Sequence, residues 1–122
     1  YPPFQILAAK TVHSENSIAF RFEYRGKSLV ITGDADYDQD IIELSNNTDL
    51  LIADCSFTES MKGQGHMTPK ECGLVAKKAG ARKLLLSHFY PLPFPDDERI
   101  KECKQVFDGD VSLAEDFLEF NL

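Results

Sequence analysis

Alternation of apolar and polar side chains in the first third of the chain predicts β-strands. Residues 4–12 are rich in apolar side chains, and residues 17–24 alternate as expected for a strand with one buried face. Arg25 and Gly26 then separate this run from residues 27–32, and glycine tolerates the positive φ that a tight hairpin needs. We therefore expect the fold to begin with a meander of strands.

Helical and strand patterns alternate after this meander. Residues 38–47 carry apolar side chains at helical spacing, whereas residues 49–54 are too uniformly apolar for an exposed strand and predict a strand in mid-sheet. Further elements are expected as a buried strand at 83–87, a stiff proline-rich loop at 90–95, a surface helix at 96–106, and short strands around Val111 and at 117–120. The order favours an α/β layer with a mixed sheet.

The clearest local signal is the start of a helix at Thr68. Its hydroxyl can cap the helix, Pro69 suits the first helical position, and Glu71 can complete a capping box. Small apolar residues follow on one face, and Gly80 predicts the C-cap. We therefore expect a helix that lies close to the sheet.

Composition and charge narrow the class of protein. The chain has 122 residues, 43% of them hydrophobic, and a net charge of −7, which together predict one globular domain and argue against a general nucleic-acid coat. No apolar run approaches the roughly 20 residues of a membrane span. Three cysteines without a CxxC pair favour neither a disulfide framework nor a structural zinc knuckle, so a reducing cytoplasm is expected. The chain starts at Tyr1 without a methionine or a signal peptide, and we expect it to be processed or part of a longer protein.

Candidate chemistry gathers at the ends of predicted elements. Asp34, Asp54 and His88 each end a predicted strand, and the carboxyl ends of neighbouring parallel strands share one edge of a sheet, where ligand sites collect. His13 follows a strand and His66 precedes the capped helix, so both can face the same edge. Carboxylates and imidazoles meeting there can bind a metal or move protons.

Each of these residues also has a structural interpretation. A single histidine at a strand end is more often hydrogen-bonded than a ligand, Asp34 after a glycine suits a turn, and Asp54 can cap the following loop. Cys55 is either a reactive thiol or, as we favour, a small buried residue.

A set of motifs in fixed order extends over nearly the whole chain. The motifs are Thr11-Val12-His13, Ile31-Thr32-Gly33-Asp34, Leu51-Ile52-Ala53-Asp54-Cys55-Ser56-Phe57, Gly65-His66-Met67-Thr68, Leu84-Leu85-Leu86-Ser87-His88 and Asp116-Phe117-Leu118-Glu119. This set resembles the C-terminal half of the metallo-β-lactamase fold in its ribonuclease Z-like branch. The resemblance implies a four-layer αββα sandwich, of which residues 1–122 would supply one mixed sheet with helices on one face.

The resemblance also implies roles for the five residues. The aspartate that matches Asp34 bridges two metal ions, and the histidines that match His13 and His88 bind one ion each. The residue matching His66 assists the transition state together with an acidic partner, for which Asp54 is the candidate. Two zinc ions are implied for the intact protein, with manganese or iron as alternatives. Two metal ions held side by side can generate hydroxide from water and hold a phosphodiester.

Departures from the family pattern limit these expectations. The His-x-His-x-Asp-His motif of the N-terminal half is absent, so we expect this chain to be half of a catalytic unit that alone binds metal weakly or not at all and is inactive. Only 20 residues separate His13 from Asp34, which leaves no room for a tRNA-gripping arm. The Ser-x-Arg-Tyr pattern is also missing after His88. A small phosphodiester, cyclic phosphate or other ester is therefore favoured over tRNA.

The leading hypothesis is a hydrolase that attacks a phosphodiester or related ester with metal-bound hydroxide. One rival is a non-catalytic interaction or regulatory module with the same half-fold, and another is a thiol enzyme that uses Cys55. A half-sandwich exposes an apolar sheet face, so we expect association with a second copy or with the missing N-terminal half.

Overall fold

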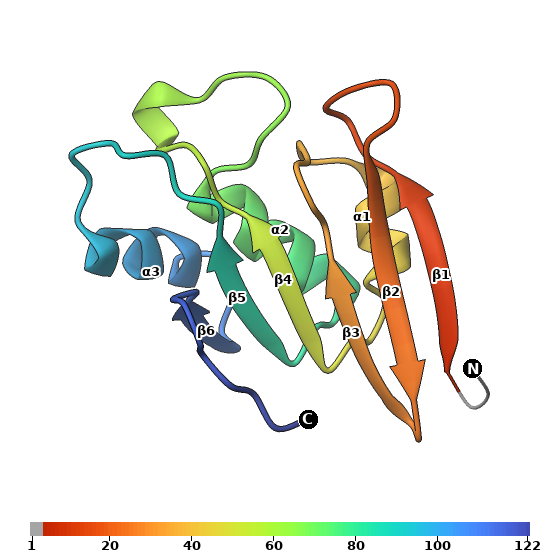
Figure 1. The fold of residues 1–122 in the computed structure, drawn as a ribbon. Helices are drawn as coiled ribbons and strands as arrows, with labels where there is room; N and C mark the ends of the chain where they lie inside the picture. The colour runs from red at the N-terminus through yellow and green to blue at the C-terminus, as the bar shows by residue number, and fades with distance from the viewer. Residues whose placement is uncertain (1–3) are drawn as a thin grey trace.

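The computed structural model describes residues 4–122, and in this part of the chain the strands form one six-stranded sheet (Figure 1). The order in the sheet follows the order in the chain: β1 (Gln5–Lys10), β2 (Ile18–Tyr24), β3 (Lys27–Ile31), β4 (Leu50–Asp54), β5 (Lys83–Ser87) and β6 (Asp110–Leu113). The helices are α1 (Gln39–Leu44), the short 3₁₀ helix η1 (Glu59–Met61), α2 (Pro69–Ala79) and α3 (Asp96–Lys104). The predicted α/β class with a mixed sheet is confirmed.

Strand β3 pairs antiparallel with β2 on one side and parallel with β4 on the other. The strands β1, β2 and β3 pair antiparallel as the predicted meander, and the turn between β2 and β3 places Arg25 at φ 48° and Gly26 at φ 76°. From β3 onward the neighbours pair in parallel, through β4 and β5 to β6. A parallel pair needs a crossover connection, and the helices provide it. As a result, β1, β3, β4 and β5 all end at one edge of the sheet.

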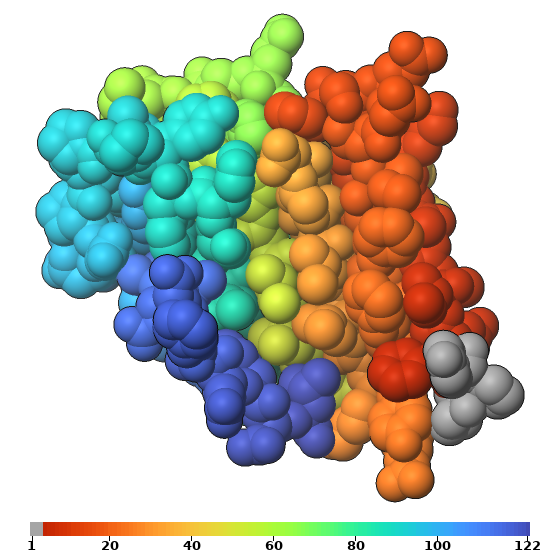
Figure 2. Space-filling view, viewed as in Figure 1, coloured from red at the N-terminus to blue at the C-terminus, as the bar shows by residue number. Residues whose placement is uncertain are grey.

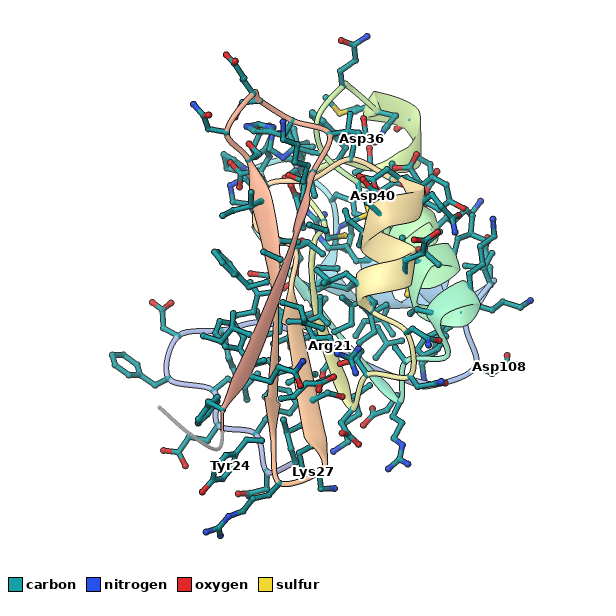
Figure 3. All side chains as sticks on the ribbon, turned by 90° about the vertical axis from the view of Figure 1, so that its right-hand side faces the viewer. Arg21, Tyr24, Lys27, Asp36, Asp40 and Asp108 are labelled. Atoms are coloured by element: carbon teal, nitrogen blue, oxygen red, sulfur yellow. The ribbon has the colours of Figure 1, made fainter. Side chains whose placement is uncertain are left out.

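The helices cover one face of this sheet (Figures 1 and 3), and the core lies between them. Val30, Leu51 and Leu84 point from adjacent strands into this core and are almost completely buried. The facing side of α2 carries Cys72, Val75, Ala76 and Ala79, which are buried as well. Small side chains let the helix approach the sheet closely, as the sequence predicted.

Helix α2 has the predicted caps. The Thr68 hydroxyl accepts a hydrogen bond from the Glu71 amide at 3.3 Å, and the Glu71 carboxylate accepts one from the Thr68 amide at 2.9 Å. Pro69 occupies the first helical position, and Gly80 ends the helix at φ 69°. The capping box fixes the start of α2, and with it the residues just before Thr68.

The opposite face of the sheet is apolar and largely open (Figure 2). Ile6, Phe20 and Ile31 share this face by strand register and are 57%, 37% and 38% exposed. The segment after β6 crosses the lower part of the face (Figure 1), where Leu122 lines a hollow together with Phe22. Within residues 4–122, the helices thus form a layer on one side of the sheet.

One predicted strand is absent from the described residues, and several predicted boundaries were wrong. The helices expected at 38–47 and 96–106 end at Leu44 and Lys104. Residues 117–120 form no strand, because Phe117 has φ 64° and the Leu118 amide donates to the Glu115 carbonyl in a turn. The first strand ends at Lys10 rather than at residue 12. No helix within residues 4–122 is long and apolar enough to cross a bilayer.

Candidate metal centre

The five predicted site residues meet at the edge where β1, β3, β4 and β5 end. Asp34 lies three residues after β3, Asp54 is the last residue of β4, and His88 directly follows β5. His13 comes from the loop after β1, and His66 lies two residues before the N-cap of α2. Asp34, Asp54 and His88 line a depression of about 200 Å³ at this edge.

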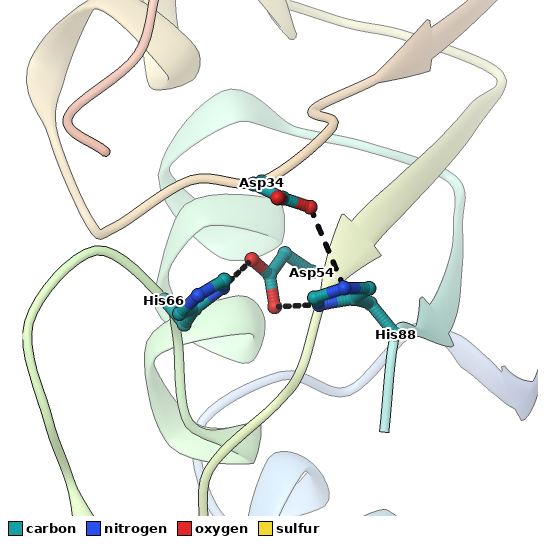
Figure 4. A group of neighbouring side chains, drawn as sticks. All are labelled: Asp34, Asp54, His66 and His88. Atoms are coloured by element: carbon teal, nitrogen blue, oxygen red, sulfur yellow. Dashed lines mark hydrogen bonds and ion pairs between the residues drawn. The ribbon is translucent and has the colours of Figure 1, made fainter. Parts of the chain in front are cut away.

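Asp34 stands between two imidazoles. The Nε2 atom of His13 lies 3.5 Å from one carboxylate oxygen, and the Nε2 atom of His88 lies 3.5 Å from the other. The side chain of Asp34 is 46% exposed, so its oxygens are accessible to a ligand. Figure 4 shows Asp34 above His88, with Asp54 and His66 deeper in the site.

The spacing fits a carboxylate that is shared by two metal ions. Two ligand atoms at about 2.1 Å from one tetrahedral zinc ion lie about 3.4 Å apart, which is close to both Nε2-to-oxygen distances. Imidazole nitrogen and carboxylate oxygen are also the donors that zinc accepts. The donors of His13, Asp34 and His88 are therefore chemically suited to hold metal.

A backbone carbonyl sets the orientation of the His13 ring. Its Nδ1 atom lies 3.0 Å from the carbonyl oxygen of Gly65, which can only accept a hydrogen bond. Nδ1 therefore donates to this carbonyl, and Nε2 is the nitrogen that faces Asp34. This is the usual arrangement for a metal-binding histidine, whose second nitrogen donates to a carbonyl or a carboxylate.

Ser56 orients His88 in a similar way. The Ser56 hydroxyl donates to Asp54 Oδ1 at 2.5 Å, and its oxygen lies 2.8 Å from Nδ1 of His88. Because the single hydroxyl proton is directed to the carboxylate, Ser56 accepts from Nδ1, and Nε2 of His88 is left free to face Asp34. His88 itself has φ 58°, a strained backbone conformation that is concentrated at functional sites.

Asp54 and His66 form a buried pair beneath Asp34. Nδ1 of His66 lies 2.5 Å from Asp54 Oδ2, which also accepts a hydrogen bond from the Ala35 amide at 3.0 Å. Asp54 Oδ1 accepts from both the amide and the hydroxyl of Ser56. Donor atoms of Asp34, Asp54, His66 and His88 lie within 4.8 Å of one another, so this set too could hold an ion. Because protein donors already occupy both Asp54 oxygens, we assign Asp54 to orienting His66.

Aromatic rings form one wall of the site. The Tyr90 hydroxyl lies 3.2 Å from Nε2 of His66, and the Phe57 ring packs edge-on against both of these residues. The sequence suggests Tyr90 as part of a stiff loop, with the alternative that Phe89 and Tyr90, directly after His88, wall a substrate pocket. The contact of Tyr90 with His66 could not be read from the chain because the two residues are 24 positions apart.

An ion pair lies behind the segment that carries His66. The Lys62 ammonium donates to Asp36 at 2.5 Å and to Glu71 at 2.9 Å. Partial burial alone would raise the pKa of Asp36, but Lys62 and the amides of Gly65 and Tyr37 outweigh this effect and lower it. Partial burial likewise would lower the pKa of Lys62, and its two carboxylate partners raise it instead.

The three cysteines belong to the hydrophobic core. Cys55, Cys72 and Cys103 are all completely buried and unpaired. Burial raises the pKa of the Cys103 thiol to about 12 and that of Cys72 well above its usual value. Cys55 is therefore inaccessible to a substrate in this structure, which argues against the thiol-enzyme interpretation.

Comparison with known proteins agrees with the fold. The profile of the family described as "Beta-lactamase superfamily domain" matches residues 3–89. The chain therefore belongs to the beta-lactamase superfamily, and its fold is that of the metallo-β-lactamase proteins. This superfamily includes metal-dependent hydrolases, as the relatives of the chain illustrate.

The chain is similar to a probable metallo-hydrolase, YhfI of Bacillus subtilis, with 40% identity over 114 residues; the match covers 92% of this chain and 46% of YhfI. The crystal structure of YhfI superposes with a TM-score of 0.88 at 38% identity, over 94% of this chain and 47% of that one. Ribonuclease Z of Archaeoglobus fulgidus is 36% identical over 80% of this chain and 33% of its own length. The short form of human tRNase Z superposes with a TM-score of 0.74 at 26% identity, over 97% of this chain and 43% of that one. The chain thus spans about half the length of YhfI and about a third of the archaeal ribonuclease Z.

Proposed function

We propose that this chain contributes to a metal-dependent hydrolase that cleaves a phosphodiester or a related ester. The observation that carries the proposal is the position of Asp34, with an imidazole Nε2 atom 3.5 Å from each of its oxygens. In this proposal His13, Asp34 and His88 are metal ligands, and His66 and Asp54 act in catalysis. Zinc is the expected metal because the donors are two imidazoles and a carboxylate, with manganese or iron as alternatives.

We further propose that residues 1–122 are the C-terminal half of the catalytic domain. Each ion would receive one imidazole and one shared carboxylate from this chain, whereas a catalytic zinc ion usually has three protein ligands. The chain also spans about half of YhfI. An N-terminal half with the His-x-His-x-Asp-His motif would complete the ligand set and cover the open sheet face. The chain alone is then expected to bind zinc weakly and to be inactive.

In the proposed mechanism, residues of this chain orient His66 and transfer a proton. When bound, the metal would supply Lewis acidity for the activation of water and for the substrate oxygen. Asp54 holds Nδ1 of His66 at 2.5 Å and thereby fixes the ring with Nε2 facing the Tyr90 hydroxyl. Nε2 of His66 would hold the proton that passes to the leaving oxygen, a role that suits a histidine oriented by a buried carboxylate. Tyr90 and Phe57 shield this nitrogen from water.

A small phosphodiester or cyclic phosphate is the substrate class that we favour. The net charge of −7 gives no general attraction to a tRNA backbone. The 20 residues between His13 and Asp34 form a short loop and β2–β3, without an inserted arm. Ribonuclease Z relatives make tRNA the competing substrate class, so a tRNA precursor is compared with small diesters in the same test.

The test uses the protein expressed from the complete reading frame that encodes this chain. Replacing Asp34 with alanine should remove both metal content and hydrolysis of bis(p-nitrophenyl) phosphate, because one carboxylate serves both ions. The loss should exceed the roughly 10–100-fold that removal of an outer partner costs. Asp108→Ala is the matched control, since Asp108 is exposed and far from the site (Figure 3). Full turnover and full metal content in Asp34→Ala would contradict the proposal and favour the non-catalytic module. Faster cleavage of a tRNA precursor than of any small diester would overturn the substrate class.

A further inference from the structure

The segment Gly65-His66 is held from behind by two charged side chains. Lys62 donates to the carbonyl oxygen of His66, and Asp36 accepts a hydrogen bond from the Gly65 amide at 2.9 Å. Lys62 and Asp36 also pair with each other at 2.5 Å. In Figure 3, Asp36 lies at the end of the sheet that carries the site, opposite Tyr24 and Lys27. The Lys62–Asp36 ion pair therefore fixes both the Gly65 amide and the His66 carbonyl.

The same segment touches the site through two imidazoles. The Gly65 carbonyl lies 3.0 Å from Nδ1 of His13, and the ring of His66 packs at 4.7 Å, centroid to centroid, against that of His13. A shift of the segment would therefore change the protonated nitrogen of His13 and the position of His66 together.

We propose that Lys62 and Asp36 are positioning residues, which hold the Gly65 carbonyl in place so that His13 keeps its proton on Nδ1 and offers Nε2 beside Asp34. The inference rests on the proposed metal role of His13, but it also concerns the metal-free protein. Lys62 is suited to the task because an ammonium has three donors, and here the donors reach Asp36, the His66 carbonyl and Glu71.

Glu71 links this arrangement to α2. Its carboxylate accepts from both Lys62 and the Thr68 amide, each at 2.9 Å. The loop that begins at Thr58 is thus tied to the first turn of the helix as well as to Asp36. Glu71 belongs to α2 and Asp36 to the loop between β3 and α1, so the segment is held by residues of the fold on two sides.

The first measurement determines the tautomer of His13 in the complete protein after removal of metal. Long-range proton–nitrogen NMR at a pH of about 8, where histidine is neutral, distinguishes Nδ1–H from Nε2–H. We expect Nδ1–H for the wild type. An Nε2–H tautomer of His13 in the wild type would overturn the inference, even if no variant could be purified.

The second measurement repeats the spectrum on Lys62→Met and on the milder Asp36→Asn, with Lys101→Met as the matched control. Lys101 also pairs with two carboxylates, Asp97 at 3.2 Å and Glu98 at 2.7 Å, but it is exposed on α3. The two site variants should show a mixture of tautomers and should bind zinc about 10-fold or more weakly in competition with a chelator. The control should match the wild type in both readouts.

The outcomes separate this inference from the proposed function. If the wild type binds zinc and the site variants bind it equally well with an unchanged tautomer, Lys62 and Asp36 have only a structural role and the inference fails. If the wild type binds no zinc, the proposed function fails, and the change in tautomer still decides the inference.

Discussion

At the residue scale, the centre depends on which nitrogen of each histidine carries the proton. Gly65 decides this for His13 and Ser56 decides it for His88, and both contacts leave Nε2 facing Asp34. The two partners are 52 and 32 positions away from their histidines in the chain. A sequence pattern can therefore identify the histidines, while only the fold reveals what orients them.

Two features of Gly65 disfavour any other residue: its positive φ and the short distance to His13. Experiment can separate the two effects. Its φ is 83°, and a Cβ atom there would lie 2.9 Å from Nδ1 of His13. Gly26 has a similar φ of 76° with nothing within 4 Å of its Cβ position. Gly26→Ala should cost about 1–2 kcal/mol of unfolding free energy from the backbone alone. Gly65→Ala should cost at least about 1 kcal/mol more, because His13 must move. Chemical denaturation measures both, and equal costs would contradict the close approach of His13 to Gly65.

The partly buried carboxylate of Glu102 on α3 should make the stability of the fold depend on pH. One of its carboxylate oxygens is buried without a hydrogen-bond partner, and burial together with the charge of Glu59 raises its pKa against the opposing effects of Lys70 and Arg99. A raised pKa in the folded state means that the protonated form is favoured by folding. Stability is therefore present below the unfolded-state pKa and is lost as the pH rises through the folded-state pKa.

Glu102→Gln should accordingly raise the melting temperature at pH 7, and the gain should vanish near pH 4. We expect the gain to stay below about 1 kcal/mol because solvent partly screens the carboxylate. Glu115→Gln, on an exposed residue, is the control. A gain that persists unchanged at pH 4 would show that desolvation of the charge is not its cause.

At the element scale, the parts of the fold that depend on local chemistry were predictable from the sequence. The capping box of α2, the glycine that ends this helix and the buried strand β4 follow from residue types at short spacing. The predicted strand at 117–120 failed for a related reason. Its apolar residues suggest a strand, but the edge of the sheet already ends with β6 and the chain turns at Phe117.

The candidate site was likewise predictable only in part: its residues could be named from the sequence, but some of their contacts could not. The five candidate residues could be named because they end strands or precede a helix, and the parallel order of β3, β4 and β5 brings three of them to one edge. The contacts of Lys62, and that of Tyr90 with His66, could not be predicted, because loops have no periodic pattern and the partners lie far away in the chain.

The start of α2 should be sensitive to its N-cap. Thr68→Ala removes the acceptor for the Glu71 amide and should lower the unfolding free energy by about 1 kcal/mol. Thr68→Ser keeps the oxygen and should restore most of the loss. Denaturant titration followed by circular dichroism gives both values. Equal stability of the serine and alanine variants would indicate that the lost methyl contact, not the cap, determines the cost.

At the scale of the whole molecule, one face of the sheet exposes apolar side chains that no described helix covers. Ile6 and Phe20 lie on the paired strands β1 and β2 with no helix above them. Exposed apolar surface of this kind is costly in water. Expressed as residues 1–122 alone, the chain should self-associate or aggregate through this face.

Light scattering measures this association directly. The double variant Ile6→Lys and Phe20→Lys should shift the chain toward a monomer, because two charges would be buried in the contact. Ile41 is a poor control because it belongs to the core, so Met61→Lys, on an exposed residue of η1, is preferred. A monodisperse wild-type monomer would contradict the prediction.

The order of the strands has a consequence for synthesis on the ribosome. Because each new strand becomes the neighbour of the previous one, the sheet can grow by addition at a single border as the polypeptide emerges. His88, the last of the five site residues in the chain, emerges from the ribosome before α3 and β6 do. The five side chains can therefore come together before α3 and β6 have emerged, and these two elements then cover the border of the sheet beside β5.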